Sequence, residues 1–113
     1  MDFLKKPLSD RLTESKKIID KYPSRVPIIV TKNNKCKLKD IDKNKYLVPN
    51  DMTIGQFIYT IRKRLQLEPH LALFFFINNK VVATSSIILE VYNNEKNEDG
   101  FLYITYQDEN TFG

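Results

Sequence analysis

Apolar side chains recur most regularly between Thr53 and Leu65, and their spacing predicts an α-helix there. The apolar positions of this segment fall three and four residues apart: Ile54, Phe57, Ile58, Ile61 and Leu65. Residues 53–56 (Thr-Ile-Gly-Gln) have the T-x-x-Q form of a capping box, which predicts where the helix begins. Three consecutive cations at 62–64 suit the negative end of the helix dipole, so we expect the helix to end there.

A second amphipathic stripe predicts a helix over residues 8–22. Its stripe residues are Leu8, Leu12, Ser15, Ile18, Ile19 and Tyr22. We expect Ser9 or Asp10 to cap its start and Pro23 to end it. Residues 2–6 fit one further helical turn ahead of it.

Four runs of β-branched and aromatic residues predict strands at 26–31, 46–49, 73–77 and 101–106. The polar loop at 32–44 should be held to the core by Leu38 and Ile41, and a third, short helix should start at Ser85 or Ser86. After the leading helix, the order strand–strand–helix–strand–helix–strand is that of a ubiquitin-like β-grasp fold. We therefore predict an α+β protein with a four-stranded mixed sheet and an N-terminal helical extension.

The length and composition fit one globular domain. With 113 residues, 42% hydrophobic and 28% charged, the chain is long enough for a single core. We expect a helical extension at 1–24, a β-grasp domain at 25–106 and a flexible tail at 107–113. The longest wholly apolar run, 71–77, is too short to span a bilayer, and the first residues lack the pattern of a signal peptide.

Cofactor and metal motifs are absent from the sequence. Its three glycines form no phosphate-cradling loop. The single Cys36 and the single His70 can make neither an internal disulfide nor an ordinary structural zinc site. We therefore expect no cofactor, no metal and a reduced, intracellular setting.

Candidate catalytic groups do not form a convincing set. Cys36 follows lysines that could lower the pKa of its thiol, but His70, the one available imidazole base, lies at a helix–strand junction. The carboxylate candidates all fall in hydrophilic segments, where we expect them to be solvated: Asp40, Asp42, Glu95, Glu98 and Asp99. The sequence predicts that this protein is not an enzyme.

Charge is distributed unevenly along the chain. Residues 1–64 hold 16 lysines and arginines against 7 acids, whereas residues 65–113 hold 2 against 7. The basic half is either a solvated face or a surface for acidic peptides, anionic lipid or nucleic acid. No nucleic-acid-binding motif accompanies it, so we expect no nucleic-acid partner.

The strand around Tyr46 offers a candidate binding edge. Tyr46 and Val48 should face one side of the sheet while Lys45 and Leu47 face the other, so only one pair can enter the core. Either the leading helix or a loop covers the remaining side chains, or the strand is an edge that pairs with an incoming peptide.

The chain ends in Thr111-Phe112-Gly113. A side chain at the last position would crowd the carbonyl during adenylate and thioester formation, and glycine removes that obstacle. On a β-grasp domain with a tail, Gly113 therefore suggests a carboxylate that is activated and passed to an amine.

Several blocks, in order, make the sequence from Leu8 to Gly113 resemble the autophagy ubiquitin-like modifiers, the family typified by the GABA-receptor-associated protein and autophagy-related protein eight. The matching blocks are residues 21–27 (KYPSRVP), 42–49 (DKNKYLVP), 55–57 (GQF), 61–64 (IRKR), 99–103 (DGFLY) and 109–113 (ENTFG).

The resemblance implies two pockets that receive an aromatic-x-x-aliphatic peptide motif. The implied aromatic pocket comprises Glu14, Ile18, Pro27, Ile29, Lys45, Leu47 and Phe101. The implied aliphatic pocket comprises Tyr46, Val48, Pro49, Met52, Phe57, Thr60 and Ile61. A basic rim of Arg25, Lys43 and Arg64 is implied beside them, and it should favour acidic residues that flank the motif.

The resemblance also implies conjugation of Gly113 to phosphatidylethanolamine by an activating and a conjugating enzyme, with a cysteine protease for delipidation. Cargo receptors would be the peptide partners, and the protein would move from cytoplasm to the autophagosome membrane. A plastid membrane in a protist is the alternative destination. The alternative functions are a peptide-binding adaptor that is never conjugated and a modifier attached to protein lysines.

Three features depart from the family pattern. Thr60 replaces an aliphatic residue, which should make the aliphatic pocket more polar, and Val30-Thr31 replaces a pair that ends in an acid. Many family precursors continue past the glycine and need a protease to expose it, whereas this chain stops at Gly113.

Overall fold

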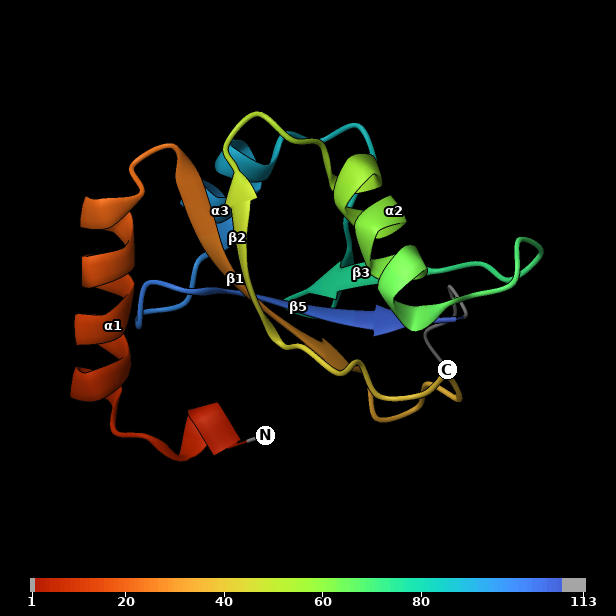
Figure 1. The fold of residues 1–113 in the computed structure, drawn as a ribbon, viewed down its shortest axis with the longest axis horizontal. Helices are drawn as coiled ribbons and strands as arrows, with labels where there is room; N and C mark the ends of the chain where they lie inside the picture. The colour runs from red at the N-terminus through yellow and green to blue at the C-terminus, as the bar shows by residue number, and fades with distance from the viewer. Residues whose placement is uncertain (1, 109–113) are drawn as a thin grey trace.

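Helices lie on both faces of a mixed β-sheet, with α1 on one face and α2 on the other (Figure 1). The structure is a computed structural model that describes residues 2–108. Along the chain its elements are η1 (Asp2–Lys5), α1 (Leu8–Lys21), β1 (Arg25–Lys32), β2 (Lys45–Pro49), α2 (Ile54–Leu65), β3 (Phe74–Ile77), β4 (Lys80–Val81), α3 (Ile88–Glu95) and β5 (Leu102–Gln107). The predicted turn at 2–6 is the 3-10 helix η1.

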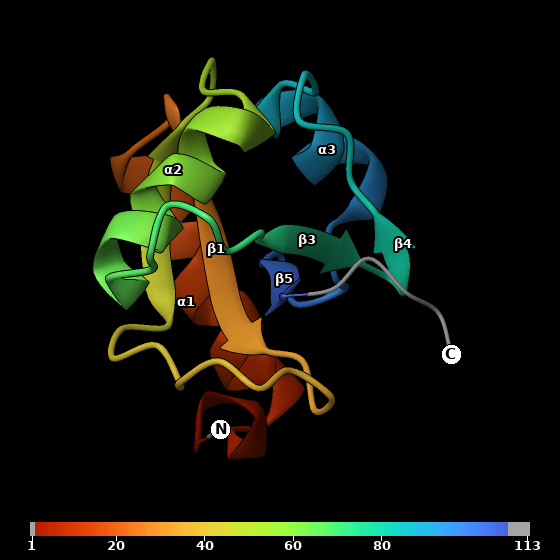
Figure 2. The same cartoon turned by 90° about the vertical axis from the view of Figure 1, so that its right-hand side faces the viewer.

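Within residues 2–108 the sheet has five strands in the order β2-β1-β5-β3-β4. The central strand β1 pairs antiparallel with β2 and parallel with β5. β3 then pairs antiparallel with both β5 and β4, which completes the sheet (Figure 2). The mixed sheet around α2 confirms the predicted ubiquitin-like fold.

Alternate side chains of β1 enter two different apolar clusters. Ile28 and Val30 join the main core, which contains the buried face of α2, and the predicted loop anchors Leu38 and Ile41 also pack there. Ile29, between them, joins a smaller cluster on the α1 side. Because both faces of β1 are covered, the strand reads as a continuous apolar run. Each fully buried isoleucine contributes about 1.5–3 kcal/mol of apolar burial.

The fifth strand, β4, is an addition to the predicted four. A two-residue turn at Asn78 and Asn79 returns the chain so that Lys80 pairs with Ile77. Both asparagines have positive φ, 51° and 64°, the geometry of the tight turn that matches strand twist. Two exposed residues carry no periodic signal, so the strand was not predictable from alternation.

The predicted N-cap of α1 is wrong, although the helix begins where it was predicted. The helix begins at Leu8 directly after Pro7, and no side chain of the described chain caps it by a hydrogen bond. Pro7 brings the backbone in with an extended ψ of 150°, so Ser9 and Asp10 already lie within the first turn.

The predicted start of α3 is also displaced. The helix begins at Ile88, with Ile87 as its N-cap, rather than at Ser85 or Ser86. A β-bridge between Ile87 and Thr53 keeps the chain extended up to that point.

The end of β5 shifts the predicted tail boundary by one residue. Gln107 pairs with Phe74 and is buried, so it belongs to the sheet. The predicted conjugation residue, Gly113, lies outside the described residues. In residues 2–108, no helix has the length and apolarity that a membrane crossing requires.

Candidate functional site

The candidate site is built around β2, which occupies one end of the strand order. Its Tyr46 and Val48 pack with the main core, while Lys45 reaches Glu14 of α1 on the opposite face. The structure therefore selects Tyr46 and Val48 as the pair that enters the core. Leu47 is half-buried, and its carbonyl accepts a hydrogen bond from Arg25 Nη1 at 3.2 Å.

Residues of the implied aromatic pocket come together on the α1 side of the sheet. Ile29 and Phe101 form one buried cluster, and Ile18 of α1 packs against it. Lys45 Nζ lies 2.9 Å from Glu14 Oε2, which joins β2 to α1 across this cluster. Pro27 is buried and pairs with Leu47 in the sheet register.

Phe3 is a member of this cluster that the sequence reasoning missed. Its ring meets the ring of Phe101 edge-on, with centroids 5.0 Å apart. Lys45 Nζ stands 4.2 Å from the centroid of the Phe3 ring, within cation–π range. Phe3 is the first aromatic residue of the sequence and the only one before Tyr22. An isolated aromatic side chain in a predicted helical turn was the one sequence signal that this residue packs against the domain.

The implied aliphatic pocket lies on the α2 side of β2. Phe57, Ile61 and Val48 are buried in the main core, whereas Met52 and Pro49 are half-buried. The Tyr46 ring meets Phe57 edge-on at 5.6 Å. Its hydroxyl is buried without a hydrogen-bond partner among the described residues, and burial raises the pKa of Tyr46.

Thr60 lies on the exposed side of α2, next to that cluster in sequence. Its hydroxyl donates to the carbonyl of Gln56 one turn earlier, at 3.3 Å. The hydroxyl is therefore partly satisfied within the helix itself, which reduces the polarity that Thr60 adds to the pocket.

The predicted basic rim is partly neutralised. Arg64 forms two hydrogen bonds to Asp42, at 2.8 and 3.3 Å, and these lower the pKa of the Asp42 carboxyl. Lys43 Nζ lies 5.1 Å from the Tyr46 ring centroid. Arg25, Lys43 and Arg64 thus lie near β2, but Arg64 already holds a carboxylate.

The surroundings of Cys36 do not favour a reactive thiolate. Cys36 is buried, and burial raises the pKa of its thiol rather than lowering it. His70 is exposed, with Nδ1 3.5 Å from a carboxylate oxygen of Glu68. Across residues 2–108, no group of His, Cys, Asp and Glu side chains is arranged to hold a metal ion.

Asp99 corrects another expectation, because it is buried rather than solvated. Arg11 Nη1 donates to it at 2.7 Å, and the hydroxyl of Tyr103 and the backbone N–H of Phe101 also donate to its carboxylate. These contacts fix α1 against the start of β5, directly beside Phe101.

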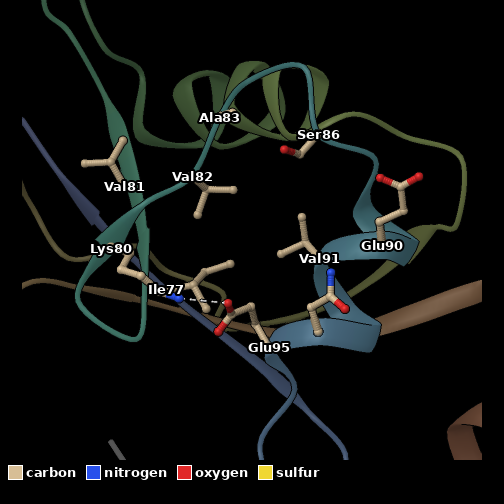
Figure 3. Close-up of a pocket in the computed structure, with 10 residues that line it drawn as sticks. Ile77, Lys80, Val81, Val82, Ala83, Ser86, Glu90, Val91 and Glu95 are labelled. Carbon is tan, nitrogen blue, oxygen red and sulfur yellow. Dashed lines mark hydrogen bonds and ion pairs between the residues drawn. The ribbon is translucent and has the colours of Figure 1, made fainter.

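A hollow of about 260 Å³ lies between α3 and the β3–β4 hairpin (Figure 3). Val82 and Val91 point into it, and Lys80 and Glu95 form an ion pair of 3.0 Å at its border. It is remote in the strand order from β2, so it contributes nothing to the first site.

The fold and the β2 edge define a class, that of ubiquitin-like proteins with an N-terminal helical extension. The family model described as autophagy protein Atg8, ubiquitin-like, matches residues 10–113. The chain belongs to this family.

Individual relatives match over nearly the whole chain. Autophagy-related protein 8A of Oryza sativa subsp. indica is 50% identical over 110 residues, which cover 97% of this chain and 92% of that protein. Autophagy-related protein 8 of Schizosaccharomyces pombe is 52% identical over 103 residues, or 91% and 85% of the two chains. The crystal structure of Trypanosoma brucei ATG8 superposes with a TM-score of 0.90 at 39% identity, covering 97% of this chain and 95% of that one.

Proposed function

We propose that this protein is a modifier that is conjugated through Gly113 to phosphatidylethanolamine, acts in autophagosome formation and serves as a membrane-bound adaptor for aromatic-x-x-aliphatic peptides. It is a substrate of enzymes, not an enzyme. The observation that carries the adaptor role is the position of β2, at one end of the sheet with a separate apolar cluster on each of its faces.

The arrangement around β2 suits an extended peptide. An added strand would pair with the backbone of β2, and its alternate side chains would point to opposite faces. One side chain would then approach Ile29 and Phe101, and a side chain on the opposite face would approach Phe57 and Ile61. The backbone pairing supplies generic affinity, while the two clusters select an aromatic and an aliphatic residue.

The charges near β2 favour acidic residues that flank the peptide motif. Arg25 and Lys43 border the strand, and Arg64 would have to exchange Asp42 for a peptide carboxylate. Exposed pairs such as Arg64 with Asp42 are weak, so this exchange is accessible. The charges should act mainly on the association rate.

The conjugation role is supported by the family and by the number of residues between the sheet and Gly113. β5 ends at Gln107, six positions before Gly113. Fully extended, six residues reach about 20 Å, which allows Gly113 to approach an enzyme without unfolding β5. The partners are an activating enzyme, a conjugating enzyme, a cysteine protease for delipidation and cargo receptors. The protein would be cytoplasmic before conjugation and on the autophagosome membrane afterwards.

Reconstitution tests the conjugation role. Activating enzyme, conjugating enzyme, ATP and phosphatidylethanolamine liposomes should convert the wild type to an amide that is heavier by one lipid less one water, measured by mass spectrometry. Gly113→Ala should fold normally and conjugate at least about tenfold more slowly, because its methyl group crowds the carbonyl, a barrier increase of about 1.4 kcal/mol.

An unchanged mass after reaction, or an adduct on a protein lysine, would contradict the lipid assignment. A normal conjugation rate for Gly113→Ala would contradict the steric reason for glycine.

A further inference from the structure

Phe3 lies where the implied aromatic pocket should be open. Its side chain is only 5% exposed, and it forms one cluster with Ile29 and Phe101, which are 0% and 1% exposed. Ile18 packs against the same cluster. The residues that would receive the aromatic side chain of a peptide are therefore already covered, and Phe3 is one of the groups that cover them.

Polar contacts hold this arrangement in place. Lys45 Nζ lies 4.2 Å from the Phe3 ring centroid, and the same ammonium pairs with Glu14 at 2.9 Å. Lys6, three residues after Phe3, lies 3.5 Å from the other oxygen of Glu14. The groups that the resemblance places in the pocket, Glu14 and Lys45, thus bind the protein's own N-terminal segment.

The turn η1, which carries Phe3, has few contacts that hold it against the domain. η1 is a single 3-10 turn of four residues, and Phe3 is its only buried member. Leu4, the next residue, is 51% exposed. A short turn with one buried side chain has few apolar contacts to lose when it opens, and salt weakens the Lys6–Glu14 pair.

We propose that Phe3 is an intramolecular occupant of the aromatic pocket, so that a peptide binds the groove only after η1 swings away. The inference rests on the proposed function of the β2 groove and adds its regulation. The closed turn competes with every peptide aromatic side chain for Ile29 and Phe101. If the closed form is populated at about 90%, the apparent affinity is about tenfold weaker than that of the open groove.

Affinity measurements test this competition. An acidic Phe-x-x-Leu peptide is titrated by calorimetry into wild type, Phe3→Ala and Leu4→Ala. Phe3→Ala should bind about tenfold more tightly, whereas Leu4→Ala, its exposed neighbour, should match the wild type. Thermal unfolding of each variant verifies that the domain is folded.

Tryptophan fluorescence tests the displacement itself. The chain contains no tryptophan, so Phe3→Trp introduces a single tryptophan that can be excited selectively over the tyrosines, and the peptide carries no tryptophan. The emission of Trp at position 3 should be blue-shifted in the free protein, where the ring is buried. It should move to the red at saturating peptide, because the displaced ring is then exposed to water. Leu4→Trp, the matched control, should emit in the red with and without peptide.

The outcomes separate this inference from the proposed groove. Leu47→Ala removes groove contact without touching η1, so equal affinity of Leu47→Ala and wild type would overturn the groove itself. Weaker binding by Leu47→Ala, together with unchanged or weaker binding by Phe3→Ala, would retain the groove and overturn the occlusion. An unchanged emission of the Phe3→Trp variant at saturating peptide would also overturn the occlusion, since the introduced ring would then share the pocket with the peptide.

Discussion

At the residue scale, Asp99 shows how a buried charge is accommodated. Arg11, Tyr103 and the backbone N–H of Phe101 donate to its carboxylate, and the hydroxyl of Ser15 donates to its carbonyl at 2.6 Å. A buried carboxylate is tolerated only when it is paired and hydrogen-bonded in this way. The sequence suggested a solvated Asp99 because Arg11 stands 88 positions away, and no local pattern connects the two.

Tyr103 gives a pH prediction at this scale. Burial, together with its hydrogen bond to the Asp99 carboxylate, raises the pKa of Tyr103 from 10.0 to about 12. The folded state therefore holds the phenol proton more tightly than the unfolded state does. This contribution is complete below pH 10 and is lost as the pH rises towards 12.

Denaturant unfolding between about pH 9 and pH 12 measures the effect. Tyr103→Phe should be less stable than wild type at the lower pH, and the difference should shrink as the pH approaches 12. Tyr59→Phe, at a residue that is 59% exposed, is the control and should follow the wild type throughout. A Tyr103→Phe deficit that stays constant with pH would contradict the assignment.

At the scale of elements, predictability followed the strength of the local signal. Residues 54–65 combine a regular apolar face with a capping box, and α2 was predicted with its cap. β4 has two exposed residues, and its existence depends on the Asn78-Asn79 turn rather than on periodicity. The starts of α1 and α3 depend on Pro7 and on the Thr53–Ile87 bridge, which outweigh the nearby serines as caps.

The cap of α2 gives a prediction at this scale. Thr53 Oγ1 accepts from the N–H of Gln56 at 3.1 Å, and Gln56 Oε1 accepts from the N–H of Thr53 at 2.9 Å. Thr53→Ala removes one of these bonds and should lower the free energy of unfolding by about 1 kcal/mol.

Ser9→Ala is the matched control for the cap. Ser9 is exposed and lies inside the first turn of α1, so its loss should change stability by less than about 0.5 kcal/mol. Urea unfolding of both variants measures the difference. An equal loss of stability in Thr53→Ala and Ser9→Ala would mean that Ser9 acts as a cap of α1.

At the scale of the whole molecule, the site joins segments that are distant in sequence. α1, β1, β2 and β5 each contribute to the cluster around Ile29, and the N-terminal turn adds Phe3. The resemblance indicated the groove residues because their motifs are contiguous in sequence. It could not indicate the contacts of Phe3 or the Asp42–Arg64 pair. These contacts depend on how η1 and the polar loop before β2 pack in three dimensions.

Peptide binding along β2 is the most direct test of the proposed groove. An acidic aromatic-x-x-aliphatic peptide is titrated into wild type, Leu47→Ala and Val81→Ala at two salt concentrations. Val81 lies 39% exposed on β4, at the far end of the strand order, and serves as the control. Leu47→Ala should weaken binding roughly tenfold to a hundredfold, the equivalent of about 1.5–3 kcal/mol of apolar contact. Val81→Ala should match the wild type, and salt should weaken peptide binding by all three proteins. Equal affinity of wild type and Leu47→Ala would place the peptide elsewhere and contradict the groove.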